Sequence, residues 1–171
     1  MTRENVAIRP ALTRRAPALI RLSNPLTRKL LKIGMPMGPN VLMTVRGRSS
    51  GEPRSAAVGI VEIAGRRFVI GAYGPVQWVH NLRAAGEADI RVHGETVRVR
   101  GTELDRESAL AFYRDTLPGY IAHFPWLGRL FAKALFGSVA PEILNNPERA
   151  AVVRPVFELQ LVDQGQASVP R

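Results

Sequence analysis

The sequence predicts one domain of the α+β, mainly β class, in which a small antiparallel barrel carries flanking helices. Five short β-prone segments between residues 41 and 103 are joined by tight turns, which favours antiparallel pairing, because parallel strands need long crossovers. Residues 96–103 alternate valine with arginine, so one face is apolar and the other wet. A chain of 171 residues that is 46% hydrophobic fits one sizeable core, and no repeat or linker marks a second domain.

The first forty residues are predicted to form a basic arm followed by an amphipathic helix. Eight arginines and lysines face a single acid, Glu4, in this stretch. Asn24 and Pro25 suit the start of a helix, and leucines and an isoleucine follow at helical spacing. Two interpretations stay open for residues 24–33. The helix contacts an anionic membrane, where each cation contributes roughly 1 kcal/mol, or it covers one end of the barrel.

The barrel domain is expected to span residues 41–163. Its first five strands are expected at residues 41–46, 55–62, 67–73, 89–93 and 96–103. A hairpin turn at residues 64–66 joins the second strand to the third, and a short helix at residues 75–84 carries Trp78 and ends at Gly86.

Helices are predicted between the fifth strand and the last. Asp105 caps a helix over residues 106–117, and Pro118 with Gly119 is expected to break it. Residues 120–137 are apolar and aromatic, and their spacing is helical over 126–136. Residues 141–153 are expected to be helical with a break at Asn146 and Pro147. The alternating segment 156–162 is the expected closing strand, and residues 164–171 are a tail.

The connection between the first two strands has the composition of an anion-binding loop. Gly47 and Gly51 can adopt positive φ and turn backbone N–H groups toward a ligand. Ser49 and Ser50 add hydroxyl donors. Guanidinium groups that suit phosphate or carboxylate oxygens come from Arg46, Arg48 and Arg54. A solvated hairpin turn has a similar composition, so the loop alone leaves both interpretations open.

This loop, followed by Trp78-x-x-Asn81-Leu82-Arg83, resembles the deazaflavin (F420)-dependent nitroreductase and quinone reductase family, whose members are split β-barrels. The positions that match the family's loop pattern are Thr44, Gly47, Arg48, Ser50, Gly51 and Arg54. Ser49 stands where lysine is common. The resemblance runs over residues 41–103 and returns at the closing strand, and the two motifs together are more specific than either alone.

The resemblance implies that coenzyme F420 lies across the barrel mouth, with FMN or a fatty acid as alternative occupants. Its acidic tail would lie on Arg46, Arg48, Ser49, Ser50, Gly51, Pro53 and Arg54. Ala72, Tyr73 and Gly74 would meet the ring, although the family often has Ser-Lys-Gly-Gly there. Trp78 would pack beneath the cofactor or the loop, or act as an ordinary core residue. Asn81 would hold the turn by side-chain hydrogen bonds.

The resemblance also implies a hydride transfer to an apolar conjugated acceptor such as a quinone or an activated ene or nitro compound. Nitroreductase members carry Tyr-Pro-x-Tyr-x-x-Tyr where this chain has Leu-Pro-Gly-Tyr-Ile-Ala-His at residues 117–123, a departure that bears on nitro reduction more than on cofactor binding. Tyr120 or His123 would supply the proton, or merely pack at a loop rim. A non-catalytic fatty-acid-binding or other-cofactor-binding barrel is the alternative function.

The amino-acid composition argues against several other kinds of functional site and partner. The absence of cysteine excludes disulfides, thiolate metal sites and cysteine nucleophiles, and the three histidines lack ligand spacing, so no metal is expected. The formal net charge of +10 attracts polyanions, but no motif for specific nucleic-acid recognition accompanies it. We expect a cytoplasmic monomer or homodimer, with peripheral contact at the inner membrane face. The excess of arginine over lysine is typical of GC-rich genomes such as actinobacterial ones.

Overall fold

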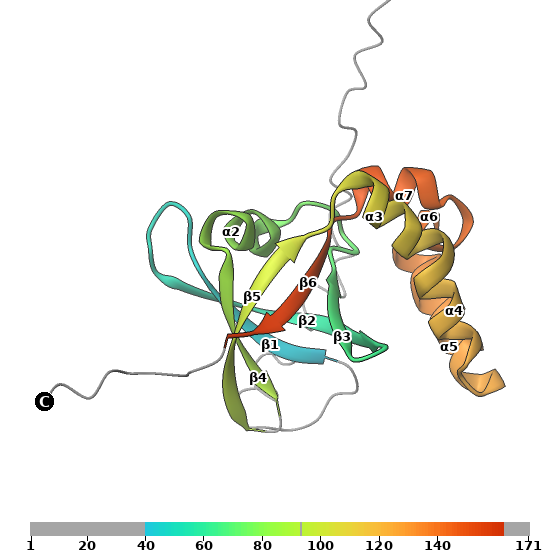
Figure 1. The fold of residues 1–171 in the computed structure, drawn as a ribbon, viewed down its shortest axis with the longest axis horizontal. Coiled ribbons are helices and arrows are strands. Elements are labelled where there is room, and N and C mark those ends of the chain that lie inside the picture. The colour runs from blue at the N-terminus through green and yellow to red at the C-terminus, as the bar shows by residue number, and fades with distance from the viewer. Residues whose placement is uncertain (1–39, 93, 163–171) are drawn as a thin grey trace, which may run out of the picture.

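A computed structural model describes residues 40–92 and 94–162, and within them six antiparallel strands form a closed barrel (Figure 1). The strands are β1 (Asn40–Arg46), β2 (Pro53–Ile63), β3 (Arg66–Ile70), β4 (Glu87–Val92), β5 (Glu95–Glu103) and β6 (Val156–Leu161). Their order around the barrel is β1-β2-β3-β6-β5-β4, and pairing of β4 with β1 closes it. The predicted fold class is confirmed, with β6 inserted between β3 and β5 as the closing strand.

The third strand is shorter than predicted. The expectation of residues 67–73 is wrong at its C-terminal end, because β3 stops at Ile70. The Gly71 N–H donates to the carbonyl of Pro155 at 2.8 Å, and the Ala72 N–H turns back to the carbonyl of Ile70 at 2.9 Å. Residues 71–76, named here the β3–α2 segment, therefore leave the barrel and lead into helix α2 (Gln77–Ala85), which ends at Gly86 as expected.

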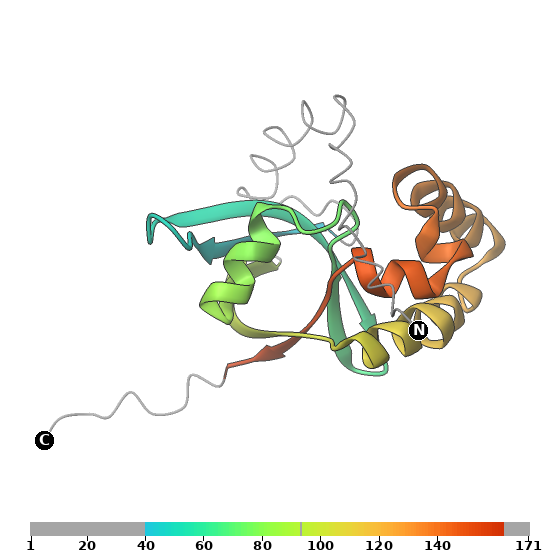
Figure 2. The ribbon, with the colours of Figure 1, turned by 90° about the horizontal axis from the view of Figure 1, so that it is seen from above.

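Apolar side chains fill the barrel, and α2 covers one end of it (Figure 2). Val79 and Leu82 of α2 are fully buried against Met43, Val99 and Phe157 of the strands. Burying a side chain of this size contributes roughly 1.5–3 kcal/mol, so this contact fixes α2 against the barrel. The position of α2 matters because it contacts both parts of the candidate site described below.

A layer of helices covers the outside of β3 and β6 (Figure 1). The helices are α3 (Arg106–Ala111), a π-helical stretch (Phe112–Thr116), α4 (Leu117–Ala122), α5 (Trp126–Val139), α6 (Glu142–Asn145) and α7 (Pro147–Val153). Phe68 and Val156 of the strands pack into this layer against Phe112, Tyr113 and Ile143. The predicted Asp105 cap is present, since its side chain accepts the Ser108 N–H at 2.8 Å. The predicted break at Asn146 is present between α6 and α7.

The expected break at Pro118 and Gly119 is wrong. The chain stays helical through both residues, because a π-helical stretch precedes α4 and Pro118 occupies its first turn. Proline is tolerated there because the π-helical stretch shifts the backbone hydrogen bonds just before it, so that the Leu117 N–H donates to the Phe112 carbonyl. No helix in the described part of the chain is long and apolar enough to cross a membrane. The predicted helix at residues 24–33 and the tail at 164–171 lie outside the described residues.

Candidate functional site

Residues 46–54, named here the arginine loop, join β1 to β2 at the outer end of a long hairpin (Figures 1 and 2). The register pairs Arg46 with Pro53, and inside the hairpin the hydroxyls of Thr44 and Ser55 hydrogen-bond at 2.9 Å. Arg46, Arg48, Ser49, Ser50, Gly51, Pro53 and Arg54 are all exposed. The structure therefore groups the predicted tail-binding residues on one accessible turn.

Only one of the two loop glycines uses the left-handed region. Gly51 has φ of +71°, while Gly47 does not have a positive φ, so that part of the expectation is wrong. Gly47 is instead required by close packing, because a Cβ there would lie 3.1 Å from the Glu52 carbonyl oxygen and from the Ser50 hydroxyl. The Gly47 N–H donates to that carbonyl at 2.8 Å and fixes the turn.

Arg48 connects the arginine loop to α2. Its backbone N–H donates to the Asn81 side-chain oxygen at 3.3 Å, and its guanidinium donates to the same oxygen at 3.2 Å and to Gln77 at 2.9 Å. Asn81 is 6% exposed, so this acceptor is held inside the fold. The hydrogen bonds expected of Asn81 are present, and they hold the loop against the N-terminal half of α2.

The β3–α2 segment, which contains the predicted ring contacts Ala72, Tyr73 and Gly74, is held from its other side. Arg154 is 5% exposed and donates to the Ala72 carbonyl at 2.7 Å. Its Nε and Nη2 donate to one oxygen of the Glu142 carboxylate, with Nε at 2.9 Å. Gly74 has φ of +79°, and a Cβ there would lie 3.4 Å from the Val153 carbonyl. Sequence reasoning missed Arg154, and no motif marks it.

Three groups in this region, Glu142, Tyr73 and Tyr113, have pKa values that differ from their ordinary ones. Burial by itself raises the pKa of Glu142, but its own backbone N–H and the Arg154 guanidinium bind the carboxylate and hold its pKa below the usual value. Burial raises the pKa of Tyr73, so its phenol stays neutral beside the predicted ring site. Burial also raises the pKa of Tyr113, whose hydroxyl donates to the Arg154 carbonyl at 3.0 Å.

The other predicted site residues, Trp78, Tyr120 and His123, lie in different parts of the structure. Trp78 is half-buried and packs on Phe157, with ring centroids 6.0 Å apart, beside the barrel core. Tyr120 lies on α4 and makes an edge-to-face contact with Phe124 at 4.8 Å. His123 follows α4, and its Nδ1 lies 2.7 Å from the Gly119 carbonyl. Figures 1 and 2 both place α4 at the opposite end of the molecule from the arginine loop, so the structure does not bring Tyr120 and His123 to that loop.

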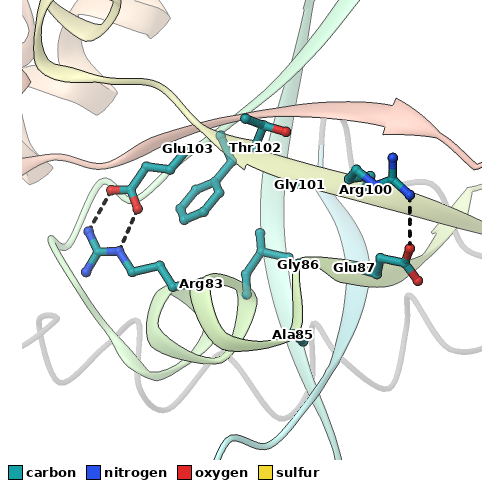
Figure 3. A pocket seen from close by; sticks show the side chains of 10 residues that line it. Arg83, Ala85, Gly86, Glu87, Arg100, Gly101, Thr102 and Glu103 are labelled. Carbon is teal, nitrogen blue, oxygen red and sulfur yellow. Dashed lines mark hydrogen bonds and ion pairs between the residues drawn. The ribbon is translucent and has the colours of Figure 1, made fainter.

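A cavity of about 460 Å³ lies at the C-terminal end of α2 (Figure 3). It is lined by Leu82, Arg83, Ala85, Gly86, Glu87, Arg100, Gly101, Thr102, Glu103 and Phe157. Its charged groups pair with one another: Arg83 binds Glu103 through two contacts of 2.6 Å, and Arg100 lies 3.6 Å from Glu87. None of the predicted site residues lines it, and α2 is about 12 Å long from the arginine-loop end to this end.

The arginine loop fits an anionic group better than this cavity does. Arg54 pairs with Glu52 at 3.2 Å, whereas Arg48 binds the neutral amides of Gln77 and Asn81 and keeps its net charge. The adjoining N-terminus of α2 has no side-chain cap and no acid in its first turn, so its partial positive charge adds to that of the loop. The donors suit a phosphate or carboxylate tail.

Comparison with known proteins identifies the family. The family model described as F420H(2)-dependent quinone reductase matches residues 25–123, more than half of the chain. The chain belongs to the F420H2-dependent quinone reductase family. The matched region contains the arginine loop, the β3–α2 segment and α2, together with Tyr120 and His123. The family predicted from the sequence is therefore confirmed, and the chain belongs among the F420-dependent oxidoreductases.

Solved structures resemble this member of the quinone reductase family only distantly. One, described as a domain-swapped dimer, has a TM-score of 0.43 and 17% identity, and covers 84% of this chain and 98% of its own. An F420-H2 dependent reductase has a TM-score of 0.41 and 18% identity, over 71% of this chain and 94% of its own. HutZ, a heme storage protein from Vibrio cholerae, has a TM-score of 0.40 and 13% identity, over 81% and 89%. A comparison with curated proteins gives no significant match.

Proposed function

We propose that this chain binds F420 with its acidic tail on the arginine loop and its ring over the β3–α2 segment, and reduces an apolar quinone. The observation that supports the proposal is the contact of Arg48 with Gln77 and Asn81 of α2, because among the described residues this guanidinium has only neutral side-chain partners. When bound, the reduced deazaflavin supplies a hydride to the acceptor.

The chain's own residues bind and orient in this proposal. Arg46, Arg48 and Arg54, with the Ser49 and Ser50 hydroxyls, attract and hold the anionic tail. Arg154 fixes the Ala72 carbonyl and so the path of the β3–α2 segment. Trp78 packs on Phe157 and so helps to hold α2 against the barrel core beneath the site. No covalent chemistry is asked of the protein.

Tyr73 is the proton source that the geometry favours. It lies in the β3–α2 segment and its phenol is protonated at neutral pH, whereas Tyr120 and His123 lie at the far end of the molecule. We expect Tyr73→Phe to lower kcat about 10²-fold or more, in line with loss of a general acid, with a smaller change in KM. Tyr120→Phe and His123→Gln are the matched controls and should change kcat less than about threefold. Loss of turnover in either control and not in Tyr73→Phe would return the role to α4.

The test of the function combines binding with turnover. F420 is titrated into purified protein and its fluorescence is followed, and the reduced cofactor is then mixed with menadione under anaerobic conditions. Saturable binding at micromolar concentration and menadione-dependent reoxidation support the proposal. Arg48→Ala should weaken this binding. Arg98→Ala is the control for that variant, since Arg98 is exposed and pairs with Asp89 on the barrel surface.

A negative result is also informative. Protein that binds no F420 but copurifies with a fatty acyl chain, detected by mass spectrometry, would replace the enzyme with the lipid-binding alternative. Tight F420 binding without menadione reduction would keep the cofactor site and reject a quinone as the acceptor.

A further inference from the structure

Helix α5 presents apolar side chains to solvent, on a side of the molecule that the proposed function does not use. Trp126, Leu127 and Leu130 are 66%, 60% and 59% exposed, although they are among the largest apolar residues of the described chain. Single exposed apolar residues are ordinary, but a contiguous group marks an interaction surface. We name these three residues, with the exposed Ala134, the α5 apolar face.

The large apolar side chains named above lie on the side of α5 that faces solvent, whereas a helix of a globular domain normally turns such side chains toward the core. At 3.6 residues per turn, Leu130 and Ala134 lie above Trp126 and Leu127 on one side of α5. The side that packs on the other helices holds Ala132, which is 7% exposed, and the half-buried Phe136. Trp126, Leu127 and Leu130 point away from that contact, so packing against the other described helices does not explain their positions.

Cations flank the α5 apolar face. Arg129 and Lys133 are exposed, lie one turn apart and share one edge of the face. No aspartate or glutamate occurs from residue 125 to residue 140, and the chain as a whole has 24 basic and 14 acidic residues. An apolar strip with tryptophan and a basic edge is the composition of a helix that lies in a lipid–water interface.

From this arrangement we propose that the α5 apolar face docks on an anionic lipid bilayer. A second copy of the chain fits less well, because antiparallel symmetric pairing would bring the Arg129 and Lys133 edges of two helices toward each other. A 14-residue helix is also small for a stable dimer contact, which buries roughly 800 Å² per partner. Figures 1 and 2 place α5 at the outer edge of the helical layer. The inference does not depend on the F420 site.

The full chain is tested by cosedimentation with vesicles of phosphatidylcholine, with and without phosphatidylglycerol. Wild-type protein should bind the anionic vesicles. The variant Trp126→Ser/Leu127→Ser/Leu130→Ser should lose at least about 100-fold in partition coefficient, and Arg129→Gln/Lys133→Gln about tenfold or more. The matched control is Val152→Ser/Leu161→Ser, which removes residues that are 54% and 57% exposed elsewhere and should bind like wild type.

Fluorescence locates the contact. The chain has two tryptophans, and Trp78 is half-buried against Phe157. Brominated lipids should quench wild-type emission, and Trp126→Phe should remove that quenching while leaving Trp78 emission. Equal binding by wild type and the triple serine variant would overturn the proposal, as would a wild type that ignores anionic vesicles. A dimer that becomes a monomer in the triple variant, with vesicle binding unchanged, would instead assign the face to a second copy.

Discussion

Arg154 contacts Ala72 at the start of the stretch between β3 and α2, Arg48 contacts α2 just after that stretch, and the two arginines use their charge differently. Arg154 is buried, and its donors are occupied by the Glu142 carboxylate and the Ala72 carbonyl. Arg48 is exposed, and its donors meet the neutral side chains of Gln77 and Asn81. The stretch between them contains Ala72, Tyr73 and Gly74, the predicted contacts of the cofactor ring.

This difference separates a structural arginine, Arg154, from the arginine that we propose as a binding residue, Arg48. The charge of Arg154 is neutralised inside the fold, and its effect is to fix one carbonyl in place. Arg48 keeps a net positive charge at the surface, and its amide partners orient it without neutralising it. A buried ion pair is costly to break, whereas an exposed cation contributes little to stability and more to binding an anion. Variants of the two should therefore fail in different assays.

The largest expected effect is on stability. Arg154→Met leaves Glu142 half-desolvated without its partner and the Ala72 carbonyl without a donor, so we expect the free energy of unfolding to fall by about 3 kcal/mol or more in urea titrations. Arg66→Met is the matched control. Arg66 also donates from Nε and Nη2 to a carboxylate, that of Glu158, but its side chain is 58% exposed, so the loss should stay below about 1 kcal/mol.

The double variant Arg154→Met/Glu142→Leu sharpens this prediction. Removing the carboxylate as well should recover part of the lost stability, because the unpaired charge is gone. A single Arg154→Met variant that unfolds like wild type would show that the buried pair does not fix the β3–α2 segment.

A smaller effect is expected at Gly74. Its φ of +79° is unfavourable for a residue with a Cβ, so Gly74→Ala should cost about 1–2 kcal/mol of unfolding free energy. Gly119→Ala is the control, because Gly119 lies inside α4 at negative φ with open space around a Cβ. That substitution should be neutral or stabilising by up to about 1 kcal/mol. Equal losses at both positions would contradict the strained turn.

The smallest expected effect is a pH dependence. The pKa of Glu142 is lower in the folded chain than in the unfolded chain, so its stabilising contribution is present above about pH 4.5 and is lost as the pH falls further. Glu142→Gln should therefore flatten the fall in unfolding free energy below that pH, as measured by urea titrations at several acidic pH values. Parallel curves for wild type and variant would mean that other carboxylates cause the fall.

Arg48 and Arg154 also illustrate which features of the fold and the candidate site can be predicted from the sequence and which cannot. The strands were predicted within a few residues, because alternating β-branched residues and short glycine turns are local signals. Arg48 was predicted, because it lies in a loop whose composition and family pattern are both local. Arg154 was not, because its burial depends on Glu142 and on Ala72, which is 82 residues away in the sequence. The helix through Pro118 was missed, because a preceding π-helical stretch has no sequence signature.

The arginine loop as the binding site for the acidic tail is the central claim, and a two-ligand cycle tests it most directly. F420 and its tail-free deazaflavin ring are titrated into wild type and Arg48→Ala, with Arg98→Ala as the charge-matched control. Each lost charged hydrogen bond is worth about 1.5–3 kcal/mol, so Arg48→Ala should weaken F420 binding by roughly 10–100-fold and leave binding of the tail-free ring unchanged. Equal weakening of both ligands, or none, would contradict the claim.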